Sequence, residues 1–97
     1  MQGELDFEWD EAKARSNLAK HGVRFEAATL LIQSRRFLEV DASRPGDRED
    51  RRKAIGLIGT SLYAVLFTHR EGRIRLISAR RANAKEEKLY GNRPVPL

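Results

Sequence analysis

The chain has 97 residues, a formal net charge of +5 and no cysteine. This length allows one domain with a modest core, and a second domain does not fit. The lack of cysteine excludes a disulfide framework and a thiolate metal site. The apolar runs are too short to cross a bilayer and the first residues show no secretory signal, so we expect a cytoplasmic protein without a membrane partner.

Charge is distributed unevenly along the chain. Residues 1–50 carry eight Lys and Arg against eleven Asp and Glu, a net charge of −3, whereas residues 51–97 carry eleven against three, a net charge of +8. Arginine outnumbers lysine, and its planar guanidinium group suits phosphates and carboxylates. A basic C-terminal half indicates a polyanionic partner, in the first place nucleic acid. The alternative is a solvated basic surface with no ligand.

The N-terminal third predicts a short strand followed by two helices. Residues 7–10 read as a strand that ends at Asp10, a good N-cap, and a helix over 11–21 follows. A second helix is expected over 25–33, although Arg24 cannot cap its free N–H groups. The apolar spacing predicts two buried stripes, the first from Ala14, Leu18 and His21 and the second from Ala28, Leu31 and Ile32.

The central part of the chain predicts four strands that pair as antiparallel hairpins. The strand patterns occur at 36–41, 51–59, 62–68 and 73–79. The third of these strands is apolar on both faces, which is typical of a central strand covered on both sides. Gly72 supplies the positive φ that the turn between the last two strands requires.

After Arg81 the pattern becomes helical. Asn83 is a suitable cap, Glu86 completes a capping box, and the helix is expected to end near Tyr90. The element order is therefore β-α-α-β-β-β-β-α. This order predicts an α+β fold, with a small antiparallel sheet, two N-terminal helices and one short C-terminal helix. We expect a single domain over 1–97, with its core at 6–91 and an extended tail at 92–97.

Arg80 has an unusual place in the last strand. Simple alternation puts Arg73 and Arg75 on one face, and Arg80 on the other face with the apolar residues Ile74 and Leu76. Arg80 would therefore follow two core residues on their own face. A guanidinium group in that position needs an acid, an anion or water.

Metal and cofactor chemistry find no support in these residues. His21 and His69 are the only histidines, and neither a metal-ligand spacing nor a Gly-rich phosphate loop occurs. No nucleophile-elbow pattern supports a Ser/His/Asp triad. We therefore expect no metal and no cofactor. What remains is a cationic group formed by Arg70 at the hairpin turn and Arg80 and Arg81 at the strand exit, with Tyr90 on the last helix.

Such a group fits the cleavage of RNA without a metal. This reaction deprotonates a 2′-hydroxyl, neutralises a pentacoordinate phosphorane and protonates the leaving 5′-oxygen. Arginine suits the second task, and Tyr, His, Lys or Glu suits the other two. Antiparallel pairing puts Arg70 and Arg80 at opposite ends of the hairpin, so they meet at one phosphate only if a bulge or twist brings them closer. The structural alternatives are arginine–carboxylate pairs, a helix-dipole cap at His21 and a packing role for Tyr90.

Several motifs together resemble the BrnT family over about residues 6–91. They are Phe7-Glu8-Trp9-Asp10, Lys13, Asn17, Lys20-His21-Gly22-Val23, Phe25-Glu26-Ala27-Ala28, Thr68-His69-Arg70, Ile74-Arg75-Leu76-Ile77-Ser78-Ala79-Arg80-Arg81-Ala82, and Glu87 with Tyr90. The resemblance implies a RelE-like fold and a metal-free ribonuclease toxin of a type II toxin–antitoxin pair that arrests translation. It also implies a BrnA antitoxin whose ribbon-helix-helix part binds DNA, so that the toxin reaches operator DNA only through its partner.

The resemblance and the basic strands together indicate the site residues. The expected catalytic residues are Arg70, Arg80, Tyr90, His21 and Glu87, the last of them for orienting an arginine. The expected RNA contacts are Lys20, Arg73, Arg75 and Arg81. The leading hypothesis is an endoribonuclease toxin, with Arg70 and Arg80 on the scissile phosphate and Tyr90 or His21 transferring protons. The alternatives are a non-catalytic nucleic-acid-binding module and a structural subunit that holds a protein partner.

Overall fold

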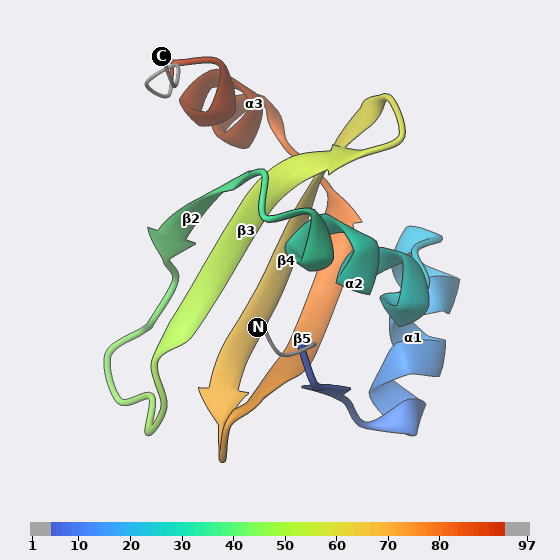
Figure 1. The fold of residues 1–97 in the computed structure, drawn as a ribbon, viewed down its shortest axis with the longest axis vertical. Coiled ribbons are helices and arrows are strands. Elements are labelled where there is room, and N and C mark those ends of the chain that lie inside the picture. Colours follow the sequence, from blue (N-terminus) through green and yellow to red (C-terminus); the bar gives the residue numbers. More distant parts are fainter. Residues whose placement is uncertain (1–4, 93–97) are drawn as a thin grey trace.

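A computed structural model of the chain describes residues 5–92, so the predicted tail lies outside the described residues apart from Asn92. The elements follow in the predicted order, with small differences at their ends (Figure 1). They are β1 (Phe7–Glu8), α1 (Glu11–His21), α2 (Phe25–Ser34), β2 (Phe37–Asp41), β3 (Arg51–Ile58), β4 (Ser61–Arg70), β5 (Arg73–Arg81) and α3 (Ala84–Gly91). The predicted α+β fold class is therefore confirmed.

The strands form one five-stranded sheet in the order β1-β5-β4-β3-β2. Strands β2 to β5 pair antiparallel, whereas the short β1 runs parallel to β5. β4 lies at the centre of the sheet, and its residues Ala64, Val65 and Phe67 are buried. The prediction that this strand is central is confirmed, and residues of both its faces are buried, although the second face is covered by a helix only at one end.

α2 covers one face of the sheet and supplies much of the core. Phe25, Leu31 and Ile32 of this helix form one buried cluster with Val65 and Phe67 of β4. The predicted stripe of α2 is buried as expected. Its first turn has no side-chain cap, so packing against the sheet holds the helix in place.

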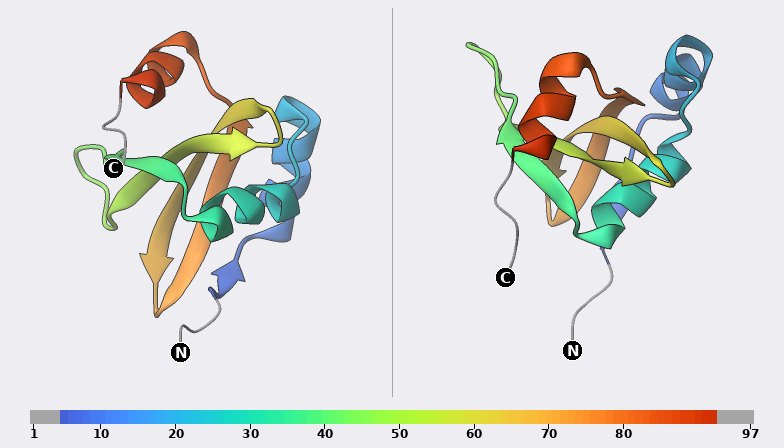
Figure 2. Two further views of the ribbon diagram at one scale, coloured as in Figure 1. Left: turned by 45° about the horizontal axis from the view of Figure 1, so that its top comes forward. Right: turned by 90° about the horizontal axis from the view of Figure 1, so that it is seen from above.

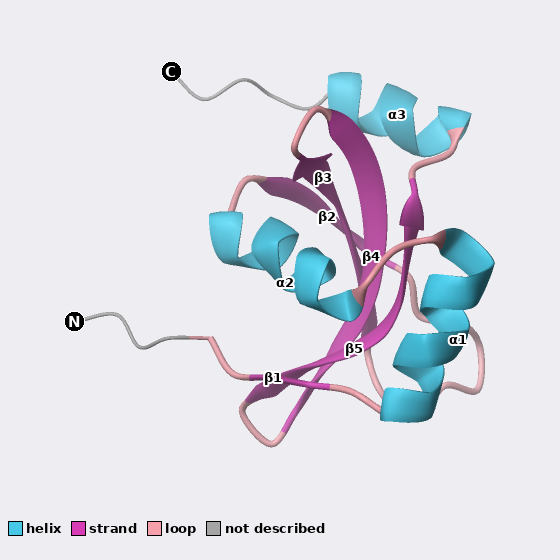
Figure 3. Cartoon of the chain, turned by 90° about the vertical axis from the view of Figure 1, so that its right-hand side faces the viewer, coloured by secondary structure: helices cyan, strands magenta, loops and turns pink. Residues whose placement is uncertain are grey.

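α1 lies along the β5 edge of the sheet (Figure 3). The Asp10 side chain caps the helix by accepting a hydrogen bond from the Lys13 N–H, as expected. The predicted apolar stripe is only partly right, because Leu18 is half-buried but His21 is exposed. The buried residue of this helix is Asn17. A helix at a sheet edge meets unpaired backbone groups, and a polar side chain suits that position.

A β-bulge interrupts the last strand. Leu66 of β4 lies opposite Ser78, whereas the next residue, Phe67, lies opposite Leu76. Ile77 is therefore an extra residue on β5 with no counterpart on β4. One extra residue in a strand exchanges the two faces for every residue that follows it.

The bulge decides which way Arg80 points. After the extra residue, Ala79 continues the core face of Leu76 and is fully buried. Arg80 consequently lies on the opposite face, which is the face of Arg73 and Arg75. The predicted face of Arg80 is wrong, because simple alternation does not anticipate an extra residue.

α3 lies across the sheet from α2 and covers one end of the second face (Figure 2). The Asn83 side chain accepts a hydrogen bond from the Glu86 N–H, and the Glu86 carboxylate accepts one from the Asn83 N–H. The predicted capping box is therefore present. Toward the β4–β5 hairpin the same face is not covered by this helix, and it carries many of the basic residues.

Candidate functional site

Six basic side chains lie on the sheet face that α3 partly covers. One of them is a residue of β4 that points to this face, and the other five lie on β3 and β5 opposite such residues. We call this set the cationic face; its members are Arg51, Lys53, Arg70, Arg73, Arg75 and Arg80. The acids that contact it are Glu8, Asp47, Glu49 and Glu86. Six positive charges against four negative charges leave the face attractive to an anion.

At the α3 end of the cationic face, Glu86 holds Arg80 through two hydrogen bonds. Arg80 Nη1 donates to Oε1 at 2.7 Å, and Nη2 donates to Oε2 at 2.9 Å, so the pair is bidentate. Lys53 of β3 donates to the same Oε2 atom at 2.7 Å. The Glu86 side chain is 2% exposed, whereas the Arg80 side chain is 36% exposed. A buried carboxylate thus fixes a guanidinium group that still faces solvent.

The ionisation of Glu86 reflects these contacts. Burial raises the pKa of a carboxyl group because it disfavours the charged form. Hydrogen bonds from Arg80, Lys53 and the Asn83 N–H outweigh burial, and the pKa of Glu86 falls to about 2. The hydrogen bond with Glu86 in turn raises the pKa of Arg80. Glu86 is therefore a poor proton acceptor near neutral pH, and its role is to hold cations.

α3 also carries two of the predicted catalytic residues. Glu87 is exposed, and the carboxylate that orients an arginine is its neighbour Glu86. Tyr90 is half-buried and follows Glu86 by four residues, so the two share one stripe of the helix. Arg80, Glu86 and Tyr90 therefore belong to the same end of the cationic face.

At the hairpin end, the arginines make looser contacts. Arg70 Nη2 lies 3.4 Å from Glu49, and Arg73 and Arg75 share Glu8 of β1 at 3.6 and 3.0 Å. The Arg70 and Arg73 side chains are 47% and 57% exposed. Exposed ion pairs contribute little to stability, so these guanidinium groups can exchange a carboxylate for another anion at small cost.

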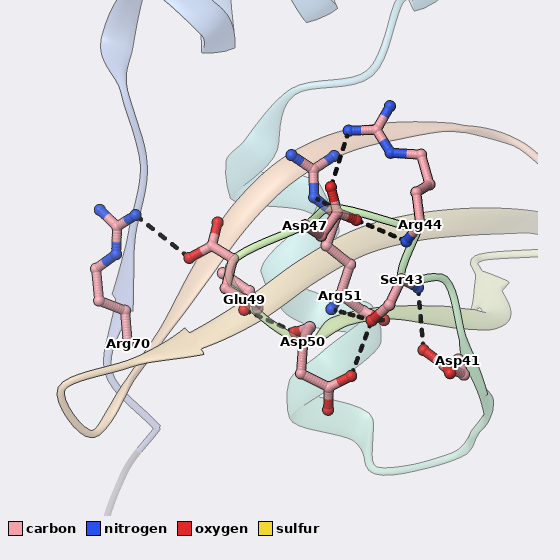
Figure 4. A network of polar contacts seen from close by, with 9 residues as sticks. Asp41, Ser43, Arg44, Asp47, Glu49, Asp50, Arg51 and Arg70 are labelled. Carbon is pink, nitrogen blue, oxygen red and sulfur yellow. Dashed lines mark hydrogen bonds and ion pairs between the residues drawn. The ribbon is translucent and has the colours of Figure 1, made fainter.

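The loop between β2 and β3 places Glu49 beside Arg70 (Figure 4). Inside the loop, the Ser43 hydroxyl donates to the Asp50 carboxylate at 2.9 Å. Thr68 of β4, which is buried, donates from Oγ1 to the Asp50 backbone carbonyl at 2.7 Å. These contacts tie the loop to the central strand and so bring the segment that carries Glu49 to the hairpin end of the cationic face.

The structure does not bring Arg70 and Arg80 together. Arg80 lies opposite Ala64 of β4, which is six residues from Arg70. At a rise of about 3.3 Å per residue, this is about 20 Å along the strand. Their partners Glu49 and Glu86 are different acids at opposite ends of the sheet. Both arginines share one face, but they are not arranged around a single phosphate.

The remaining predicted residues lie at the margin of the cationic face or away from it. Lys20 and His21 are exposed and line a surface hollow of ≈ 180 Å³ between α1 and β5, together with Ser78. Because Ser78 lies on the cationic face, this hollow adjoins it. Arg81 lies on the opposite face, where its guanidinium carbon is 5.5 Å from the centre of the Tyr63 ring.

Asn17 supports the site although the sequence did not indicate a role for it. Its Nδ2 donates to the backbone carbonyls of Ala79 and Val23 at 2.8 and 3.0 Å, and its Oδ1 accepts from the Ala79 N–H at 3.0 Å. The Asn17 amide thereby forms the hydrogen bonds that a neighbouring strand would form with Ala79 at the β5 edge, one residue before Arg80. The sequence contained one sign of this role, because the polar residue at position 17 lies on the side of α1 where apolar residues were expected.

Two general properties complete the description of residues 5–92. None of the helices there has both the length and the apolar character needed to span a membrane. No group of three or more His, Cys, Asp or Glu side chains in that range is placed to hold a metal ion.

These observations define a small α+β protein with a helix-covered core face and a cationic face whose exposed guanidinium groups suit a polyanion. Residues 9–86 match the sequence profile of the family described as "Ribonuclease toxin, BrnT, of type II toxin-antitoxin system". The match covers most of the chain, and the chain belongs to this family. Membership implies RNA as the substrate class and an antitoxin as the partner. No curated protein matches the chain.

Proposed function

We propose that the chain is a metal-independent endoribonuclease that acts in the cytoplasm and arrests translation by cutting RNA. We further propose that a BrnA-like antitoxin neutralises it and binds operator DNA through a ribbon-helix-helix part. The observation that carries the proposal is the bulge in β5, which turns Arg80 onto the cationic face where Glu86 holds it bidentately. Family membership supplies the reaction class.

Arg80 is assigned to the scissile phosphate. Negative charge grows on the phosphate oxygens as the phosphorane forms, and fixed cationic donors stabilise that charge most where they need no reorientation. Glu86 provides such fixation because it is buried and binds both Nη atoms of Arg80. It takes the orienting role that the sequence gave to Glu87.

Arg70, Arg73 and Arg75 are assigned to phosphates that flank the cleavage point. They lie at the other end of the cationic face from Arg80, about 20 Å along the strand for Arg70. Lys20, at the hollow beside Ser78, extends this binding surface past the β5 edge. A single strand of RNA that follows the face therefore meets further cations between Arg80 and the hairpin and at the β5 edge.

The reaction needs two proton transfers. A base removes the 2′-hydroxyl proton, the 2′-oxygen attacks phosphorus, and the 5′-oxygen leaves with a proton from an acid. The products are a 2′,3′-cyclic phosphate and a 5′-hydroxyl. Tyr90, one helical turn after Glu86, and His21, at the Ser78 hollow, are the residues assigned to these transfers. Guanidinium and ammonium groups then provide the charge neutralisation for which other nucleases use a metal ion.

One observation favours a second function, a non-catalytic RNA-binding module. Each cation of the cationic face contacts a carboxylate, and Arg70 and Arg80 do not share a phosphate position. A surface of this kind can hold an RNA backbone at several points without cleaving it. Its affinity would fall steeply with salt, as the release of counterions requires.

Cleavage of a defined messenger RNA tests the proposal, with purified protein alone and in a cell-free translation extract. We expect fragments ending in 2′,3′-cyclic phosphate, and a rate reduced by about 10²–10³ in Arg80→Ala, because a fixed charge donor is lost. Arg70→Ala should lose less, since Arg70 contacts a flanking phosphate. Arg70→Ala should unfold at the wild-type denaturant concentration or close to it, whereas Arg80→Ala also loses the contact with the buried Glu86 and is assayed under conditions where it is still folded. Intact RNA with the wild-type protein under both conditions would leave the binding module as the function.

A further inference from the structure

Lys53 is the unexpected member of the α3 end of the cationic face. It stands beside the buried Ala54 in β3, lies opposite Leu66, and donates from Nζ to Glu86 Oε2 at 2.7 Å. We propose that Lys53 contacts the same RNA phosphate as Arg80, so that the two residues form a two-cation clamp in which Glu86 positions both. This inference deepens the proposed function and rests on it.

The geometry brings the two cations within reach of one phosphate. Lys53 Nζ and Arg80 Nη2 both bind the Oε2 atom of Glu86, at 2.7 and 2.9 Å. Two nitrogens that share one oxygen atom at these distances are also close enough for a single phosphate group to bridge them. They reach this point from different strands, β3 and β5, on the two sides of β4.

Exposure also permits the contact. The Lys53 side chain is 26% exposed and the Arg80 side chain 36%, whereas the Glu86 side chain is 2% exposed. The carboxylate is thus enclosed between α3 and the sheet, whereas both cations keep part of their surface in contact with solvent. An anion that approaches from solvent meets the positive groups before it meets Glu86.

The balance of charge points the same way. One carboxylate neutralises one of the two cations, so this cluster retains a positive charge that a phosphodiester can match. The phosphorane carries one negative charge more than the phosphodiester, and the second cation becomes more useful as the reaction proceeds. Arg80 alone, paired with Glu86, would leave the phosphate facing a neutral pair.

A purely structural role for Lys53 makes different predictions. Glu86 accepts four hydrogen bonds, two from Arg80, one from Lys53 and one from the Asn83 N–H, which fills a carboxylate's usual capacity. If Lys53 served only to complete this set, its removal would destabilise α3 and leave cleavage by the folded protein unchanged. A clamp residue affects cleavage and phosphate affinity in protein that is still folded.

Lys53→Met is the test variant, because it keeps most of the side-chain stem and removes the charge. Arg52→Met is the matched control. Arg52 directly precedes Lys53 in β3, points to the other face, donates a hydrogen bond to Glu39 at 2.8 Å, and has a side chain that is also 26% exposed. Lys53→Arg tests rescue. Each folded protein is assayed for cleavage of an RNA and for affinity to its 2′-O-methyl analogue, which cannot react.

We expect Lys53→Met to lower the cleavage rate roughly tenfold or more, less than the loss expected for a primary charge donor. Affinity for the 2′-O-methyl RNA should also fall, Lys53→Arg should restore part of both, and Arg52→Met should resemble the wild type. Unchanged cleavage in folded Lys53→Met, or an equal loss in Arg52→Met, would overturn the clamp. If the wild type cleaves no RNA, the proposed function fails. In that case the affinity of Lys53→Met for the 2′-O-methyl RNA decides on the clamp. A loss of affinity that Arg52→Met does not share supports the clamp, and an affinity equal to that of the wild type overturns it.

Discussion

At its α3 end the cationic face has a fully buried acid, and at its hairpin end it has partly exposed ones. Glu86 is 2% exposed and binds Arg80 and Lys53 at 2.7 to 2.9 Å. Glu8 and Glu49 are 23% and 34% exposed and lie 3.0 to 3.6 Å from their arginines. The two ends therefore have similar charges but different rigidity.

This difference indicates a division of work along one face. A buried, fully hydrogen-bonded carboxylate fixes cations in one geometry, which is what stabilising a short-lived charge requires. Exposed pairs are weak and adaptable, which suits the binding of an RNA backbone whose sequence varies. Changes at the α3 end should therefore alter stability and rate, and changes at the hairpin end should alter mainly affinity.

The largest effect on stability is expected from acid at the α3 end. The pKa of Glu86 is about 2 in the folded protein, below its ordinary value of 4.5. A carboxyl group with a depressed folded-state pKa stabilises the protein above its unfolded-state pKa, and this contribution is lost as pH falls from about 4.5 to about 2. The shift corresponds to about 3 kcal/mol. Denaturant titrations between pH 7 and pH 2 should show the loss in the wild type.

Glu86→Gln is the variant that isolates this effect. It has no carboxyl group to titrate, so its deficit in unfolding free energy relative to the wild type should shrink by about 3 kcal/mol as the pH falls to 2. Glu87→Gln, on the exposed side of the same helix, serves as the control and should keep the wild-type pH dependence. A constant difference between the wild type and Glu86→Gln across this range would contradict the assignment.

The second-largest loss of stability is expected for a change of Asn17, because Asn17 forms hydrogen bonds with the strand that carries Arg80. Asn17→Ala removes three hydrogen bonds and leaves the buried Ala79 backbone groups without them. Unsatisfied buried groups of this kind cost about 1–3 kcal/mol. We expect a fall of about 2 kcal/mol in unfolding free energy, measured by urea titration, together with slower cleavage. The exposed Ser16→Ala on the same helix should leave the unfolding free energy unchanged.

The elements were predictable because local rules set them. Caps at Asp10 and Asn83, the positive φ of Gly72 and the two-sided apolar run of β4 all came directly from residue types. The boundaries then followed from the turns between them. Local chemistry also gave the capping box at Glu86, the residue that binds Arg80 and Lys53 at the α3 end of the cationic face.

The site itself was less predictable because it depends on register. No residue type in β5 marks Ile77 as an extra residue, so alternation placed Arg80 on the core face. Once the bulge exchanges the faces, Glu86 rather than Glu87 meets Arg80, and Lys53 of a different strand joins them. Arg81, expected to bind RNA, moves with the same exchange to the other face and lies over Tyr63.

The smallest effect is expected at the hairpin end, where the substitution should raise the affinity for RNA instead of weakening the protein. Glu8→Gln releases Arg73 and Arg75, which both contact this carboxylate. Two freed cations should raise the affinity for 2′-O-methyl RNA a few-fold and steepen its dependence on salt, because more counterions are released on binding. The unfolding free energy should change by less than about 1 kcal/mol, because both ion pairs of Glu8 remain in contact with solvent. Fluorescence anisotropy at several salt concentrations measures both changes. A loss of affinity in Glu8→Gln would mean that Glu8 positions its arginines as Glu86 does, and the distinction between the two ends would not hold.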